Sequence, residues 1–283
     1  MDPKKFSFNE MDLSGEMDRR SFLGTSVAVA GGILVAGALV PQLDARADIV
    51  AKDDPRLKTE WVTYPGEDPE MRAYLARPKE DKKYPAVIVI HENRGLVPHI
   101  QDVTRRMALE GFLALAPDAL SPLGGTTEDM EAVRALFGKL DYEKTVKNFV
   151  AAVKYLNTQP LSTGKVACTG FCWGGAMTNQ VAVNAPDLLA AVPYYGRVPA
   201  LEDVPKIKAA MLLHFAGNDE RINAGIPEFE AALKKAKAAY TLYLYEGAEH
   251  AFNNDSNPSR YNKEAAELAW KRTIAFFKEK LKS

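Results

Sequence analysis

The chain has 283 residues, of which 47% are hydrophobic and 26% are charged, so it is long enough to bury a substantial core. Its 36 Lys and Arg residues nearly balance its 37 Asp and Glu residues, which excludes the proteins that bind nucleic acid or anionic membranes through a basic surface. Two cysteines, Cys168 and Cys172, are too few for a disulfide-rich scaffold.

Residues 1–47 are predicted to be a targeting peptide. The pair Arg19-Arg20 precedes an uncharged, weakly hydrophobic run from Gly24 to Val40, and Ala45-Arg46-Ala47 fits the small-x-small pattern of a cleavage site. The arginine pair indicates the twin-arginine export machinery, and we expect a periplasmic or secreted mature chain without membrane contact that starts near Asp48. The alternative is an uncleaved membrane anchor, because the apolar run approaches the length of a span.

Strand-like and helix-like segments alternate along the remainder, which is predicted to form one domain over residues 48–283. The run Pro85–Ile90 is continuously apolar and largely β-branched, as in a strand buried on both faces. Further strands are predicted at Phe112–Pro117, Lys165–Thr169, Leu189–Tyr195, Ala209–Phe215 and Tyr240–Tyr245. Helices are predicted at Pro98–Glu110, Tyr142–Leu156, Ala176–Val183 and Asn262–Leu281. This alternation predicts an α/β fold with a mostly parallel central sheet and helices on both faces, with functional groups at the carboxyl ends of the strands.

The sharpest motif is Gly-Phe-Cys-Trp-Gly-Gly at Gly170–Gly175, between a predicted strand and a predicted helix. It has the G-x-nucleophile-x-G pattern of the nucleophile elbow of α/β-hydrolases, with Cys172 in place of the usual serine. The N-terminus of the following helix favours the negatively charged thiolate. The alternative is a buried cysteine in a tight turn. A nucleotide-binding loop is not favoured, because neither GxGxxG nor GK[ST] occurs.

An acid and a base follow the cysteine in the order that is typical of α/β-hydrolases. Asp219 follows the predicted strand that ends at Phe215, and His250 follows the one that ends at Tyr245. His250 is predicted to take the thiol proton and to return it to the leaving group, while Asp219 holds the imidazole in the required tautomer. Taken alone, Asp219 could equally be a turn-forming aspartate. His250, taken alone, could be a packed or surface histidine. Their order and their positions favour catalysis.

Two backbone N–H groups are predicted to form the oxyanion hole, one from Trp173 and one from Asn93. Trp173 follows the nucleophile, and Asn93 lies in the loop after the strand that ends at Ile90. In the same loop, Glu92 either controls the protonation of the thiol or forms a surface ion pair with Arg94.

These motifs resemble the dienelactone hydrolase family of the α/β-hydrolase superfamily, which includes carboxymethylenebutenolidases, over the chain from about Trp61 to Phe277. The resemblance rests on HENRGL at His91–Leu96, APD at Ala116–Asp118, GKVACTGFCWGG at Gly164–Gly175, YYG at Tyr194–Gly196, GNDE at Gly217–Glu220 and EGAEHAF at Glu246–Phe252. It implies an α/β-hydrolase fold, a triad of Cys172, His250 and Asp219, and neither a metal nor an organic cofactor. It also implies that Glu92 interacts with the resting thiol until substrate displaces it.

The chain departs from this family at the two positions where the family binds the substrate carboxylate with arginines. Ala119-Leu120-Ser121-Pro122 stands at the first, and Asn253-Asn254 at the second. The resemblance therefore implies the hydrolase chemistry more firmly than the substrate. Candidate substrate-binding residues are Arg94, Tyr195, Arg197 and Phe252. The aromatic ones fit either an aromatic-lined pocket or ordinary core packing.

The sequence thus favours a thiol-dependent hydrolase of a small carboxylic ester or lactone that works through an acyl-enzyme. One alternative is a thiol redox or sensing protein, since a reactive cysteine can be oxidised. It requires a resolving cysteine, whereas Cys168 is predicted to lie within a strand. The other alternative is a non-catalytic binding module on a hydrolase fold, against which the complete triad argues.

Overall fold

The computed structural model describes residues 49–67 and 70–282, and the predicted targeting peptide lies outside them. The strands are β1 Leu57–Tyr64, β2 Met71–Pro78, β3 Tyr84–Ile90, β4 Leu113–Pro117, β5 Ser162–Phe171, β6 Ala190–Tyr194, β7 Ala210–Ala216 and β8 Tyr240–Tyr245. The helices are α1 Pro98–Leu109, α2 Met130–Phe137, α3 Tyr142–Thr158, α4 Trp173–Asn184, α5 Glu220–Asn223, α6 Ile226–Ala236 and α7 Lys263–Lys280. Within the described ranges, no helix is long and apolar enough to span a membrane.

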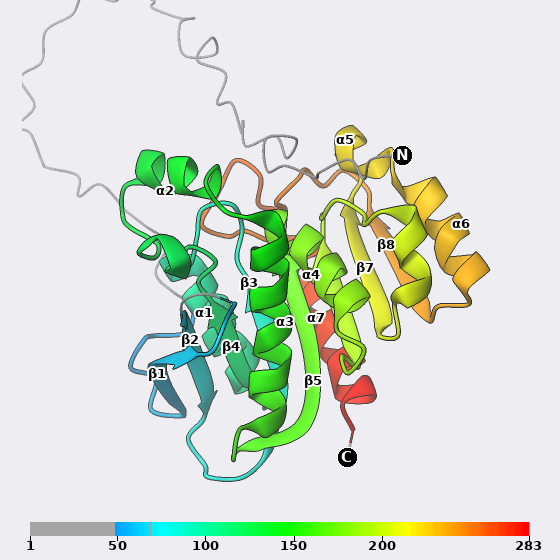
Figure 1. Ribbon diagram of the computed structural model, residues 1–283. Coiled ribbons are helices and arrows are strands. Elements are labelled where there is room, and N and C mark those ends of the chain that lie inside the picture. Colours follow the sequence, from blue (N-terminus) through cyan, green and yellow to red (C-terminus); the bar gives the residue numbers. More distant parts are fainter. Residues whose placement is uncertain (1–48, 68–69, 283) are drawn as a thin grey trace, which may run out of the picture.

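All eight strands form one sheet in the order β1-β2-β4-β3-β5-β6-β7-β8 (Figure 1). Strand β2 pairs antiparallel with β1 and with β4, and every other neighbouring pair is parallel. The predicted α/β fold with a mostly parallel sheet is therefore confirmed. The carboxyl ends of β3, β5, β6, β7 and β8 meet at one edge, where ligand sites of such sheets form.

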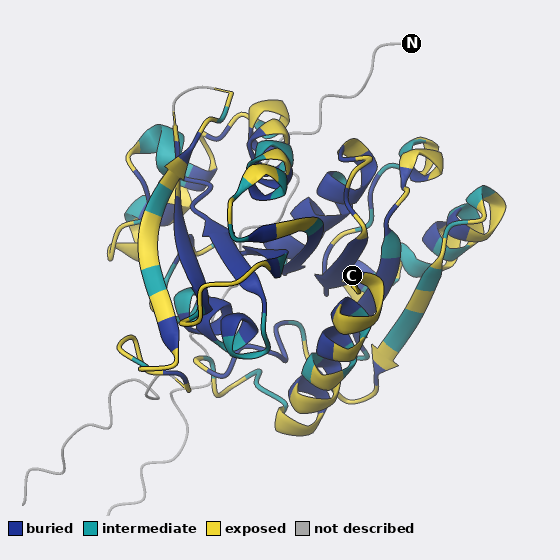
Figure 2. Ribbon diagram, turned by 90° about the horizontal axis from the view of Figure 1, so that it is seen from below, coloured by how far each residue is buried: buried dark blue, intermediate teal, exposed yellow. Residues whose placement is uncertain are grey.

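Strand β3 shows why the sheet is covered on both sides. Ile88 and Ile90 belong to a core that includes residues of α3 and α4, whereas Val87 and Val89 belong to a second core that includes residues of α1 and α7. Alternate side chains of a strand point to opposite faces, so a central strand that is apolar throughout needs helices on both. In Figure 2 the central strands are almost wholly buried, and exposed residues lie on the edge strands and on the outer sides of the helices.

The predicted elements differ from the structure mainly at their ends and at the edge of the sheet. Strand β5 continues to Phe171 rather than ending at Thr169, and α4 begins at Trp173 rather than at Ala176. Strands β1 and β2 were not predicted, nor were helices α2 and α6. β1 has the sequence LKTEWVTY, which is mostly exposed or half-buried as an edge strand, so it lacks a continuous apolar signal.

Candidate active site

Cys172 stands alone between the end of β5 and the start of α4. Its backbone has φ 55° and ψ −113°, in a region that non-glycine residues rarely adopt. Its N–H donates to the carbonyl oxygen of Tyr194, the last residue of β6, at 3.1 Å. The strand–turn–helix context predicted for the nucleophile elbow is thus present, with the half-buried thiol at the carboxyl edge of the sheet.

Close backbone contacts explain the glycines around this cysteine. A Cβ atom on Gly170 would collide with the carbonyl group of Gly174, where α4 turns back over the end of β5. A Cβ atom on Gly174 would collide with the carbonyl oxygens of Ile90 and His91, at the end of β3. Only glycine permits both approaches, which bring the first turn of α4 against the β3 strand end.

Backbone strain is concentrated around the thiol. Four non-glycine residues of the described chain have positive φ, and three of them, Cys172 (55°), Tyr195 (37°) and Ala251 (69°), belong to the candidate site. Tyr195 follows β6, and Ala251 follows the predicted catalytic histidine. Such conformations cost about 1–3 kcal/mol each and persist where the surroundings enforce them, typically at functional sites.

His250 connects the thiol with the predicted acid. Its Nδ1 is hydrogen-bonded to Oδ2 of Asp219 at 2.5 Å, and the side chain of Cys172 is close enough to the imidazole to raise its pKa. Burial lowers the pKa of His250, but the hydrogen bonds and charges of Asp219 and Cys172 outweigh it and raise the pKa from 6.5 to about 10. The structure thus brings Cys172, His250 and Asp219 together, with a hydrogen bond between His250 and Asp219.

Asp219 is held as a buried orienting group. It follows β7 and caps α5, its carboxylate accepting from the N–H of Ile222 at 3.4 Å. Only 7% of the residue is exposed. The cap leaves Oδ2 for the imidazole, so one side chain both caps α5 and contacts His250.

The residues proposed for the oxyanion hole lie at the start of α4 and in the loop after β3. Trp173 is the first residue of α4, where helical N–H groups point ahead of the helix. Its ring stacks on His91, with centroids 5.4 Å apart. Asn93 is half-buried in the loop after β3, two residues beyond His91. Because Gly174 contacts the end of β3, the start of α4 and the loop after β3 are adjacent segments. The assignment of the Trp173 and Asn93 N–H groups to the oxyanion hole remains a prediction.

Glu92 does not form the surface ion pair that was one of its two predicted roles. Only 7% of the residue is exposed, whereas Arg94 is an exposed residue. The carboxylate Oε2 of Glu92 instead accepts a hydrogen bond from Nδ2 of Asn254 at 2.8 Å. This contact joins residues 162 positions apart, so no local sequence pattern indicates it.

The four candidate substrate-binding residues fall into two groups. Arg94 and Arg197 are exposed. Tyr195 is buried beside His250, with ring centroids 5.1 Å apart. Burial raises the pKa of Tyr195 well above its ordinary value, and the negative charges of Glu92 and Cys172 raise it further. Phe252 is fully buried against Tyr195, which matches the alternative of core packing.

The second cysteine is unsuited to resolve an oxidised Cys172. Cys168 lies inside β5, is fully buried, and is free, as is Cys172. Burial raises the pKa of the Cys168 thiol to about 12, with a smaller opposing effect from its contact with Thr178. The redox alternative therefore gains no support from this residue.

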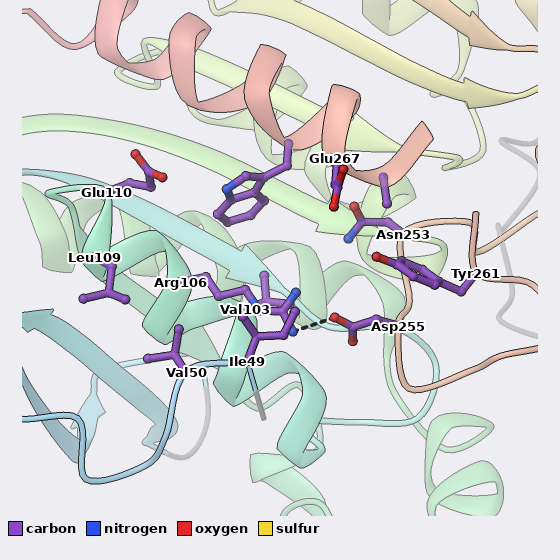
Figure 3. A pocket seen from close by; sticks show the side chains of 12 residues that line it. Ile49, Val50, Val103, Arg106, Leu109, Glu110, Asn253, Asp255, Tyr261 and Glu267 are labelled. Atoms are coloured by element: carbon purple, nitrogen blue, oxygen red, sulfur yellow. Dashed lines mark hydrogen bonds and ion pairs between the residues drawn. The ribbon is translucent and has the colours of Figure 1, made fainter. Parts of the chain in front are cut away.

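A separate cavity of about 290 Å³ lies between α1 and α7 (Figure 3). Val103 and Leu109 of α1 and Trp270 of α7 form apolar parts of its wall, which also includes Asn253 and Asp255. None of the predicted site residues lines it. The cavity thus lies beside the segment that follows His250, and it is distinct from the group around Cys172.

Comparisons with known proteins identify the family and the fold. The sequence model of the dienelactone hydrolase family matches residues 71–281. A provisionally named carboxymethylenebutenolidase from Saccharolobus solfataricus is 34% identical over 255 residues, covering 77% of this chain and 97% of the relative. A crystal structure of a provisionally assigned dienelactone hydrolase from Klebsiella pneumoniae is 28% identical, with a TM-score of 0.70, and the match covers 78% of this chain and 98% of the other. The acylaminoacyl peptidase of Pyrococcus horikoshii, 16% identical, shares the fold with a TM-score of 0.62 over 81% of this chain and 42% of its own.

Proposed function

Because the chain belongs to the dienelactone hydrolase family, we propose that it is a thiol-dependent hydrolase of small carboxylic esters or lactones with Cys172 as nucleophile. As a member of this family, the chain is a hydrolase that acts on ester or lactone bonds. The identity of the nucleophile, the triad and the acyl-enzyme are what we propose beyond this. The observation that carries this proposal is the position of His250, whose Nδ1 is hydrogen-bonded to Asp219 and whose pKa is raised by Asp219 and by Cys172.

In the proposed reaction, the sulfur of Cys172 attacks the substrate carbonyl while Nε2 of His250 holds the thiol proton. Asp219 keeps Nδ1 of His250 engaged and stabilises the imidazolium. The N–H groups of Trp173 and Asn93 stabilise the negative oxygen of the tetrahedral intermediate. His250 then donates the proton to the leaving alcohol, and a thioester remains on Cys172. Water, activated by His250, hydrolyses this thioester and restores the thiol.

The proposal is tested by comparing hydrolysis of 4-nitrophenyl acetate and of a dienelactone by the native chain and by Cys172→Ala. We expect kcat/KM of Cys172→Ala to fall at least about a thousandfold. Cys168→Ala is the matched control, because Cys168 is buried in β5 and should leave the rate within a few-fold of native. Equal rates for native and Cys172→Ala would exclude Cys172 as the nucleophile.

We also propose export by the twin-arginine route with cleavage near Ala47, which rests on the N-terminal sequence. Replacing Arg19 and Arg20 by lysine should keep the protein inside the cell, with its full N-terminal segment. N-terminal sequencing of the exported native protein should begin near Asp48. An exported protein that still begins at Met1 would contradict cleavage and favour the uncleaved membrane anchor.

A further inference from the structure

The side chain of Asn254 is clamped in one orientation. Its Oδ1 accepts hydrogen bonds from the N–H and the hydroxyl of Ser256, at 3.0 and 2.5 Å. Its Nδ2 is thereby directed to Glu92 and donates to Oε2 at 2.8 Å. Asn254 and Glu92 are only 4% and 7% exposed. A neutral amide therefore holds this buried carboxylate, where an arginine would form a charge-neutralising pair.

Among the residues that the structure describes, no cationic side chain forms an ion pair with Glu92. Its second oxygen, Oε1, is buried and has no hydrogen-bond partner in the part of the chain that the structure describes. Arg106 reaches Asp255, the residue after Asn254, but its guanidinium is shared by the carboxylates of Asp102 and Asp255. A buried carboxylate without a cationic partner repels other anions strongly, because the surrounding dielectric constant is low.

Glu92 lies beside the segment that carries the thiol of Cys172. It directly follows His91, whose carbonyl oxygen lies against Gly174 and whose ring stacks on that of Trp173, the residue after Cys172, with centroids 5.4 Å apart. Glu92 and Cys172 also both raise the pKa of Tyr195. On its other side, Cys172 is linked to the cationic His250, whose charge is opposed by Asp219. Asp219 thus offsets the imidazolium, and no cation among these residues is left to balance the carboxylate of Glu92.

We propose that Asn254 is a specificity-determining residue that makes this site select uncharged acyl groups. By binding Glu92 with an amide, Asn254 leaves the carboxylate negative, and an acyl group that carries a carboxylate is repelled from the sulfur. The substrates are then neutral esters or lactones. This statement about substrates rests on the proposed function, whereas the selection against anions at the thiol is independent of it.

The first test compares alkylation of Cys172 by iodoacetamide and by iodoacetate, which are similar in size and differ in charge. Relative to glutathione, we expect the full chain to prefer iodoacetamide by about tenfold or more, and Cys172→Ala gives the background. Glu92→Gln and Asn254→Arg should each reduce this preference, and Asn254→Asp should keep it. A native preference equal to that of glutathione overturns the proposal, and so does an unchanged preference in Glu92→Gln.

The second test compares hydrolysis of 4-nitrophenyl pentanoate with that of mono(4-nitrophenyl) glutarate, whose acyl chain ends in a carboxylate. We expect the native chain to favour the pentanoate by about tenfold in kcat/KM, and Asn254→Arg to narrow the ratio. Equal hydrolysis of both esters overturns the charge selection and leaves the proposed function intact. If neither ester reacts while alkylation shows the predicted preference, the proposed function fails and the charge selection stands.

Discussion

Nδ1 of His250 lies 2.5 Å from Oδ2 of Asp219, although 31 residues separate the two along the chain. The contact fixes which imidazole nitrogen is left for the thiol of Cys172. Asp219→Asn should therefore preserve the fold and lower kcat/KM for an activated ester by about 10² to 10⁴-fold. Asp187→Asn, at an exposed position, is the matched control and should retain the native rate. A native rate in Asp219→Asn would show that the histidine needs no orienting acid.

The His250 interactions should make stability depend on pH. The pKa of His250 is raised from 6.5 to about 10, because its hydrogen bonds and its charged partners outweigh the effect of burial. The charged imidazolium thus stabilises the fold fully below about pH 6.5, and this contribution is lost as the pH rises through about 10. The difference in Tm between native and His250→Gln should be largest near pH 6 and should shrink towards pH 10. A difference that does not vary with pH would contradict the raised pKa.

The first turn of α4 should tolerate no side chain at Gly174. A methyl group there would collide with the carbonyl oxygens of Ile90 and His91, and we expect Gly174→Ala to cost about 2 kcal/mol or more of unfolding free energy. Gly138→Ala is the matched control, because its Cβ would lie 3.6 Å from the nearest atom and its φ is −66°. Denaturant unfolding gives the free energy of unfolding of both variants. A Gly174→Ala variant as stable as Gly138→Ala would argue against the tight contact.

Asp102 should anchor the first described residues of the chain to α1. Its buried carboxylate accepts the N–H groups of Ile49 and Val50, at 3.2 and 2.8 Å, and pairs with Arg106. Asp102→Ala removes these acceptors and should cost about 3 kcal/mol or more. Glu80→Ala breaks only the exposed ion pair with Lys82 and should cost about 1 kcal/mol or less. Similar Tm values for the two variants would contradict an anchoring role for Asp102.

The parallel part of the fold and the strand-end positions of the proposed triad residues could be predicted because their signals are local. A strand buried on both faces is a continuous apolar run, as at β3, and the elbow has its own glycine pattern around Cys172. Strand ends then place Asp219 and His250 at the same edge of the sheet.

The remaining features depend on contacts that no local pattern encodes. β1 alternates irregularly between exposed and buried residues, because it is an edge strand beside β2. The bond between Asn254 and Glu92 joins segments that only the folded chain brings together. The sequence offered a surface ion pair as one role of Glu92, and burial of that loop excludes it.

The central claim, that Cys172 carries the acyl group during turnover, is tested most directly by intact-protein and peptide mass spectrometry. The full chain is mixed with 4-nitrophenyl acetate and quenched in acid within the first turnovers, in parallel with Cys172→Ala. We expect a mass increase of one acetyl group that maps to the peptide containing Cys172 and is absent from the variant. An acetyl group on another residue, or one that forms equally in Cys172→Ala, would contradict the thiol mechanism.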